Sequence, residues 1–181
     1  MQYHSSPDTF STCHKAFDDL DCGEKMRRTK QEGGDHGAKI KVDVAGSVDY
    51  RTLETLKYLA GKGDKEPPAA IGDPAQWDAC LTGSGETLAV NWAKVAVAGG
   101  SEGSGQAAWT GHVHAVDRVI MFSGIDDAIE YNLLQGNYSS PPWLSSVDGK
   151  TPKSKYFGFG EVSGTACRAW HLNFNTIAMG M

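Results

Sequence analysis

A cluster of glycines around one serine constrains this chain more than any other feature. Residues 99–103 read GGSEG; they follow a short apolar run, residues 94–98, and precede a helix-forming stretch. Glycine on both sides of the serine removes the Cβ atoms that would clash in a sharp turn from a strand into a helix. Such a turn lifts the Ser101 hydroxyl above the edge of a sheet and directs helix N–H groups toward it. The spacing therefore predicts a strand, a tight turn and a helix, with Ser101 placed as a nucleophile.

The same glycines also fit a nucleotide-binding pattern. Residues 103–108 match the looser form of the dinucleotide fingerprint, in which glycines let a backbone approach a pyrophosphate. Asp126 and Asp127, after the next predicted strand, favour this alternative because a carboxylate there can bind a ribose. A short-chain dehydrogenase, however, needs a Tyr-x-x-x-Lys pair after its glycine loop. Tyr58 and Lys62 form the only such pair, and they precede the loop.

Composition bounds the class of protein. A chain of 181 residues with 40% hydrophobic residues and 22 glycines is typical of one globular domain with many turns. The net charge of −5 argues against nucleic acid or an anionic membrane as the main partner. No apolar run approaches the roughly 20 residues of a membrane span. The polar residues 1–7 do not resemble a secretory signal, so we expect a soluble chain that is cytoplasmic by default.

The four cysteines are widely scattered at Cys13, Cys22, Cys80 and Cys167. The separation of Cys13 and Cys22 fits no zinc-knuckle spacing. We expect buried thiols, the first two being an incidental pair. The alternative is a local disulfide between Cys13 and Cys22, which would indicate an oxidising compartment.

Hydrophobic periodicity predicts a βαβ unit in the second half of the chain. Residues 1–38 are polar, with a charge-rich run at 18–30 and a loop signal at 32–37, and no strand or helix is assigned among them. The strand at 92–98 is expected to be of the fully buried kind. With the helix and strand that follow, it forms a unit with a parallel sheet. The predicted strands are 39–44, 92–98, 117–122 and 155–159, and the predicted helices are 49–60, 76–81, 104–113 and 166–179.

A series of motifs in the same order resembles a family of bacterial-type α/β-hydrolase-like proteins. Residues 99–108, GGSEGSGQAA, stand where that family typically has GHSQGGGHAA. Segments 114–124, 141–144 and 151–160 follow in the family's order, as do 21–25 and 53–60 upstream. The resemblance covers residues 13–181. It implies an α/β fold, a partial hydrolase-type, mainly parallel sheet with helices on both faces, forming a single partial domain over 1–181 that lacks parts at both ends.

The resemblance also implies a Ser–acid–His triad in that order along the chain, with Ser101 as the nucleophile. The backbone N–H of Glu102 would be one oxyanion donor. The Glu102 carboxylate replaces the family's glutamine and would disfavour an oxyanion if it turned inward. The candidates for the acid are Glu161, after the predicted strand at 155–159, and Asp126 or the adjacent Asp127, after the predicted strand at 117–122. His171 is the one histidine beyond them, inside a predicted helix.

Each of these residues has a purely structural alternative. Ser101 can be a turn serine that merely tolerates the motif. Glu161 can be a solvated loop residue, and Asp126 and Asp127 can be helix N-caps. His171, as a lone histidine in a helix, is expected to lie on a helix face, since such residues are more often structural than catalytic.

Other polar and aromatic residues are expected to lie outside the chemistry. His112 and His114 lie at the end of the predicted helix at 104–113, and we expect them to face solvent. Trp143, Tyr131 and Tyr138 can line a pocket, but packing over the sheet is the expectation, because large aromatics mainly supply buried area.

Three functions follow, in order of preference. The first is hydrolysis of esters or related small-molecule acyl substrates by an esterase- or lipase-like serine hydrolase through Ser101. The second is a non-catalytic pseudo-hydrolase or interaction module, favoured by the lack of a clear catalytic histidine. The third is NAD(P) binding at residues 99–105. No cofactor is expected for the first, and no metal site is expected from the His and Cys spacing. The open sheet edge left by missing strands suggests a homodimer as a hypothesis.

Overall fold

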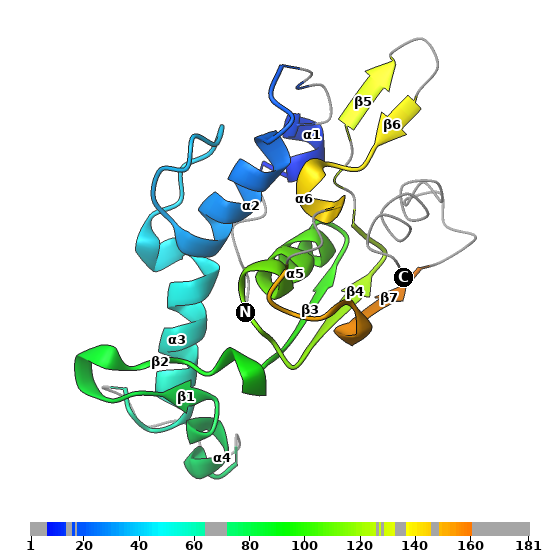
Figure 1. Cartoon of the computed structure of the whole chain (residues 1–181). Helices are drawn as coiled ribbons and strands as arrows, with labels where there is room; N and C mark the ends of the chain where they lie inside the picture. The colour runs from blue at the N-terminus through cyan, green and yellow to red at the C-terminus, as the bar shows by residue number, and fades with distance from the viewer. Residues whose placement is uncertain are drawn as a thin grey trace.

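The computed structural model describes residues 7–13, 16, 18–63, 72–125, 127, 129–132, 137–145 and 149–160. At its centre lies a three-stranded sheet in the order β3-β4-β7 (Figure 1). The strands are β3 (Ala96–Gly100), β4 (Arg118–Phe122) and β7 (Tyr156–Phe159). Both pairings are parallel, so the carboxyl ends of the strands meet at one edge of the sheet. A mixed α/β architecture with a parallel sheet is thereby confirmed.

The helix α5 (Glu102–Val113) joins β3 to β4 and packs on one face of the sheet. The register pairs Ala96 with Arg118 and Gly100 with Phe122. Strand, tight turn, helix and parallel strand therefore occur in the predicted order. The predicted strand at 92–98 is shifted, because residues Trp92–Lys94 form a short 3-10 helix before β3 begins.

Two helices from the polar N-terminal region pack near α5. They are α1 (Thr9–Cys13) and α2 (Cys22–Glu32), and α2 lies against α5. The sequence predicted no element here. Asp8 caps α1, since its carboxylate accepts a hydrogen bond of 2.7 Å from the backbone N–H of Ser11.

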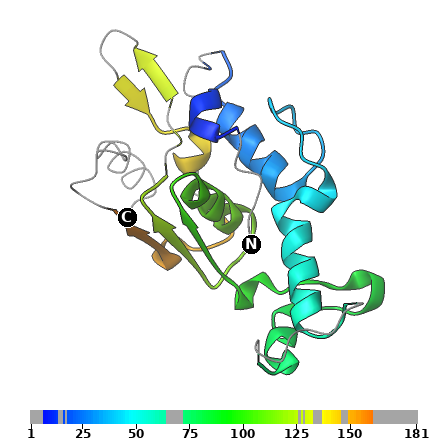
Figure 2. The same cartoon turned by 180° about the vertical axis from the view of Figure 1, so that it is seen from behind.

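The next segment extends away from the sheet as an arm (Figures 1 and 2). It begins with α3 (Val48–Leu59), whose N-cap Ser47 accepts a hydrogen bond of 3.2 Å from the Tyr50 N–H. This confirms the predicted helix at 49–60. The arm then contains α4 (Pro74–Asp78), β1 (Leu81–Thr82) and β2 (Ala89–Val90).

Short elements complete the described chain. They are η1 (Val44–Gly46), η3 (Gly85–Thr87), η4 (Trp92–Lys94), β5 (Ile129–Asn132), β6 (Asn137–Ser139), α6 (Pro142–Ser145) and η5 (Lys153–Lys155).

The main core lies between α5, the sheet and α6. Trp109 and Trp143 meet edge to face with ring centroids 5.3 Å apart, and both are buried. Trp143 therefore packs in the core, as expected. The side chains of Tyr131 and Tyr138 are not among those that the structure describes. The buried apolar residues of this cluster are Ala107, Ala108, Trp109, Val116, Val119, Met121, Ile125, Trp143 and Leu144.

The predicted strand at 39–44 is wrong. Its side chains do alternate, with Lys41 exposed and Val42 buried, but Val42 makes only one isolated bridge, with Gly34. Alternation reports which side chains face the protein; a strand also needs a partner along its length, and none of the described segments supplies one.

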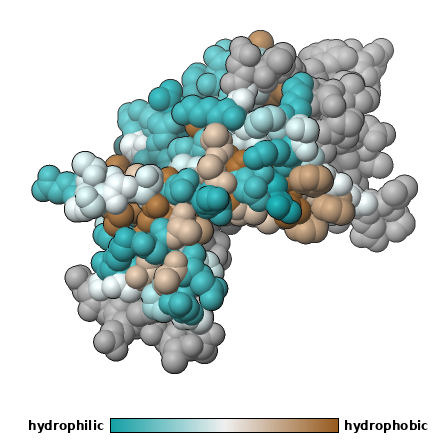
Figure 3. All heavy atoms as spheres, turned by 60° about the horizontal axis from the view of Figure 1, so that its bottom comes forward, coloured by the Kyte–Doolittle hydropathy of each residue, from teal (hydrophilic) through white to brown (hydrophobic). Residues whose placement is uncertain are grey.

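Among the described residues, α5 and α6 lie on the same side of the sheet. The expectation of helices on both faces stays a prediction, because the predicted helix at 166–179 lies outside the described residues. On the opposite face Phe122, Phe157 and Phe159 are 48%, 47% and 56% exposed. The prediction that β3 is fully buried is wrong, since Ala96, Ala98 and Gly100 are exposed. Viewed from the side of the arm, apolar residues reach the surface among hydrophilic ones (Figure 3).

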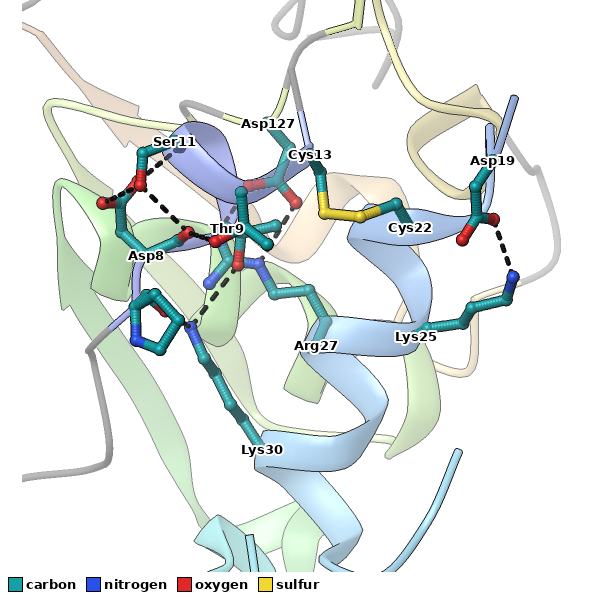
Figure 4. The surroundings of a disulfide bond; sticks show 12 residues. Asp8, Thr9, Ser11, Cys13, Asp19, Cys22, Lys25, Arg27, Lys30 and Asp127 are labelled. Carbon is teal, nitrogen blue, oxygen red and sulfur yellow. Dashed lines mark hydrogen bonds and ion pairs between the residues drawn. A yellow bond between two sulfur atoms is a disulfide. The ribbon is translucent and has the colours of Figure 1, made fainter. Parts of the chain in front are cut away.

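A disulfide joins Cys13 at the end of α1 to Cys22 at the start of α2 (Figure 4). The expectation of two free thiols is therefore wrong, and the alternative pairing is the one found. Both half-cystines are buried, and they pack with Ala16 and Met26 in a small second cluster.

Replacing Cys13 and Cys22 together with serine is expected to lower the free energy of unfolding. A short disulfide loop contributes roughly 2–3 kcal/mol by restricting the unfolded chain. Urea denaturation with and without a reductant measures the loss, and Cys80→Ser is the control because Cys80 is a free thiol. Unchanged stability in the double variant would contradict a structural role for the bond.

Candidate active site

Ser101 lies in the turn between β3 and α5 with a backbone conformation that few residues adopt. Its φ is 51° and its ψ is −122°. A non-glycine residue at positive φ is strained, and such strain concentrates at functional sites. The Ser101 N–H donates to the Phe122 carbonyl at 2.8 Å, which anchors the turn to β4. The side chain makes no capping hydrogen bond to α5, and the residue is exposed. The backbone hydrogen bond therefore anchors Ser101 in the turn, and the residue lies at the surface.

Two glycines allow the close packing that this turn requires. A Cβ atom on Gly99 would overlap the backbone carbonyl of Gly103, so glycine is needed where β3 passes the first turn of α5. A Cβ on Gly105 would overlap the guanidinium of Arg27. A pyrophosphate could approach Gly105 only if Arg27 moved, which weighs against the nucleotide-binding alternative.

A second serine, Ser104, holds the turn from inside. Its hydroxyl lies 2.9 Å from the Gly99 carbonyl oxygen and 2.8 Å from that of Phe122, and the residue is fully buried. It thereby links α5 to the ends of β3 and β4. Sequence reasoning overlooked Ser104, although a polar residue among small ones in a predicted buried turn is a usable signal.

The carboxylate of Glu102 is neutralised by two cations of α2. Its Oε1 accepts from Arg27 Nη1 at 2.8 Å, from Lys30 Nζ at 2.7 Å and from Thr9 Oγ1 at 2.9 Å. Its Oε2 accepts from Arg27 Nη2 at 2.9 Å. The carboxylate is thus paired with α1 and α2. The sequence left open that an inward-turned Glu102 carboxylate would disfavour an oxyanion. In the structure, Arg27 and Lys30 bind this carboxylate and balance its charge.

Arg27 also binds Asp127, which follows β4. Nη2 lies 2.5 Å from Oδ1, and Nε donates to Oδ2 at 3.1 Å, so the pair is bidentate (Figure 4). The Arg27 side chain is fully buried and Asp127 is 2% exposed. Asp127 therefore holds α2 against the end of β4. This ion pair accounts for the carboxylate without the helix N-cap role or the ribose-binding role that the sequence suggested.

Lys30 completes the buried charge cluster of Arg27, Lys30, Glu102 and Asp127. Burial lowers the pKa of the Lys30 ammonium, and the Glu102 carboxylate partly offsets this by favouring the charged form. Sequence reasoning missed Arg27 and Lys30, because nothing in a charged run distinguishes a buried cation from a solvated one.

A groove runs along β3 and ends at Ser101. Its volume is about 620 Å³, within the ~300–1,000 Å³ typical of small-ligand sites. One wall is the first turn of α3, and the other side is formed by β3 and one face of α5. The lining residues are Val48, Arg51, Thr52, Trp92, Val95, Ala96, Val97, Ala98, Gly99, Gly100, Ser101, Glu102, Gly103, Gln106, Ala107 and Thr110.

The histidines near α5 lie at its far end from Ser101. His114 Nε2 is 2.9 Å from Asp49 Oδ1, and the ring stacks on Trp92 with centroids 4.3 Å apart. His112 stacks on Trp109 at 5.2 Å. Both are half-buried, so the expectation that they face solvent is wrong. Because α5 has 12 residues, about 18 Å separates its ends, too far for either ring to contact Ser101.

The remaining predicted site residues, Glu161, Asp126 and His171, lie outside the described residues, as does the predicted helix at 166–179. Where residues are described, no group of His, Cys, Asp and Glu is arranged to hold a metal ion. Within the same residues, no helix has the length and apolarity that crossing a bilayer requires. Comparison of the chain with protein-family models, curated proteins and solved structures found no match.

Proposed function

We propose that this protein is a serine hydrolase in which Ser101 attacks the carbonyl carbon of an ester or related acyl substrate. The observation that carries the proposal is the backbone of Ser101, with φ 51° and ψ −122° between a parallel strand and a helix. A hydrogen-bonded N-cap serine would explain the residue without chemistry, but Ser101 makes no such bond. The strain instead serves to present an accessible hydroxyl at the carboxyl edge of the sheet.

The start of α5 supplies electrostatic support for this attack. The first N–H groups of a helix have no acceptor within it, so those of Glu102 and Gly103 are available to a developing oxyanion. The helix dipole adds positive potential at the same end. Because Arg27 and Lys30 neutralise the Glu102 carboxylate, its negative charge does not cancel that potential.

The proton acceptor and its orienting acid are assigned from the family resemblance. His171 is the proposed base, and Glu161 or Asp126 the proposed acid. The base takes the Ser101 proton as the tetrahedral intermediate forms and returns it to the leaving group.

Covalent labelling with a fluorophosphonate probe tests the proposal without knowledge of the substrate. The probe reacts with an activated serine, so labelling reports nucleophile, base and oxyanion donors together. We expect wild-type protein to be labelled and Ser101→Ala to lose labelling completely.

Ser123→Ala is the matched control, because Ser123 also has a positive φ, 52°, and follows β4 at the same edge of the sheet. It should label as the wild type does. Absence of labelling in folded wild-type protein would overturn the proposal in favour of a non-catalytic interaction module.

A further inference from the structure

The backbone of β3 presents hydrogen-bonding groups to the groove that no described strand pairs. The Val95 carbonyl and the Ser101 N–H both bond toward β4. Because backbone groups of successive residues point to opposite sides of a strand, those of Ala96, Ala98 and Gly100 point away from β4. No described strand pairs with β3 on that side.

The groove follows this edge rather than a face of the sheet. A pocket on one face would be lined by alternate residues, yet every residue from 95 to 101 lines this one. Its floor is formed by positions of α5 at helical spacing, including Gln106 and Thr110. The space therefore has the length of β3 and opens onto a row of backbone donors and acceptors without a partner strand in the described part of the chain.

Of the described residues that line this groove, one is a cation. Arg51, in the first turns of α3, lines it and has no carboxylate partner among the described residues. The groove's other charged residue, Glu102, is paired with Arg27 and Lys30. The described lining is therefore mainly apolar and carries one positive charge without a carboxylate partner, which suits an occupant that carries a carboxylate.

We propose that the groove binds an extended, acidic peptide segment as an added strand beside β3. The backbone of the segment bonds to Ala96, Ala98 and Gly100, and one of its carboxylates pairs with Arg51. Strand addition to an open sheet edge is an established mode of peptide recognition, in which main-chain bonds supply affinity and side-chain contacts supply selectivity. The bound segment ends at Ser101. The proposal concerns binding and does not depend on the reactivity of Ser101.

The test uses the full chain carrying Ser101→Ala, so that turnover cannot remove the peptide. A display library of linear hexapeptides is selected on this protein, and the strongest binders are synthesised for fluorescence anisotropy. We expect selected sequences to be enriched in Asp or Glu at one position and in β-branched residues elsewhere.

Ala98→Pro is the decisive variant. It removes the N–H that faces the groove and leaves the bonds of β3 to β4 in place, because proline is tolerated where the N–H of an edge strand faces outward. We expect at least ten-fold weaker binding. Ala98→Val keeps the N–H while it changes the side chain, so it should bind at least several-fold more tightly than Ala98→Pro, and circular dichroism checks that both variants fold.

Arg51→Gln separates charge recognition from strand addition. Acidic peptides should bind the Arg51→Gln variant several-fold more weakly than they bind the parent. Peptides in which Asn or Gln replaces the acidic residue should bind the variant and the parent with equal affinity. The proposal is overturned if no peptide is enriched, or if folded Ala98→Pro binds as tightly as Ala98→Val. Concentration-dependent dimerisation that Ala98→Pro abolishes, without peptide binding, would also overturn it and assign the edge to a second copy of the chain.

Discussion

Replacing Arg27 with methionine is expected to lower the free energy of unfolding by about 3–5 kcal/mol. The guanidinium is fully buried and binds both Glu102 and Asp127. Methionine fills a similar volume but leaves Asp127, itself 2% exposed, without its bidentate partner. At roughly 2–4 °C per kcal/mol for a chain of this size, the loss is readily measured by thermal denaturation.

The same helix provides the control. Arg28→Met removes a neighbouring arginine whose side chain is 51% exposed and pairs with Glu32 on the surface, so we expect a change below about 0.5 kcal/mol. Adding Asp127→Asn to Arg27→Met should recover part of the stability, because it removes the stranded charge. Equal melting temperatures for the Arg27 and Arg28 variants would show that the buried cluster contributes nothing to stability.

Replacing Gly99 with alanine is expected to destabilise the protein by about 3 kcal/mol or more and to abolish probe labelling of Ser101. The added methyl would overlap the Gly103 carbonyl, and both groups belong to backbone that cannot rotate away. β3 and α5 would have to separate, at the upper end of the ~1–3 kcal/mol typical of overpacking. Urea denaturation and fluorophosphonate labelling measure the two effects.

Gly100→Ala is the matched control at the adjacent position. A Cβ there would have its nearest contact, the Phe122 carbonyl oxygen, at an ordinary 3.8 Å. Stability should change by less than about 1 kcal/mol. If the two alanine variants behave alike, the close approach of β3 to α5 does not determine the shape of the turn.

The βαβ unit around Ser101 could be predicted because its requirements are local. Gly99 and Gly103 allow a tight turn in which β3 packs against the helix that directly follows it. The apolar residues before and after this turn recur at the spacing of a strand and of a helix. The same applies to α3, where Ser47 supplies a cap directly before the helical pattern. In both places the residues that determine the geometry are close in sequence.

The region around α2 could not be predicted, because its buried face is polar. Met26 is buried in this helix, but so are Arg27, Lys30 and Gln31, and a pattern of charged residues ordinarily indicates a solvated surface. Their burial depends on Glu102 and Asp127, which are remote in sequence. The prediction of a strand at 39–44 is wrong for a different reason. Its side chains do alternate between exposed and buried, but no described segment pairs with it along its length.

The buried charge cluster has a consequence for the order of folding events. The β3–α5–β4 unit around Ser101 closes within residues 96–122, whereas the hydrogen bonds of Arg27 span 75 and 100 residues. Contacts between nearby residues cost less chain entropy and form sooner than distant ones. The βαβ unit is therefore expected to assemble while Glu102 is still hydrated. Docking of α2 then removes that water, so the desolvation of the charges falls late, after the turn that holds Ser101 has taken shape.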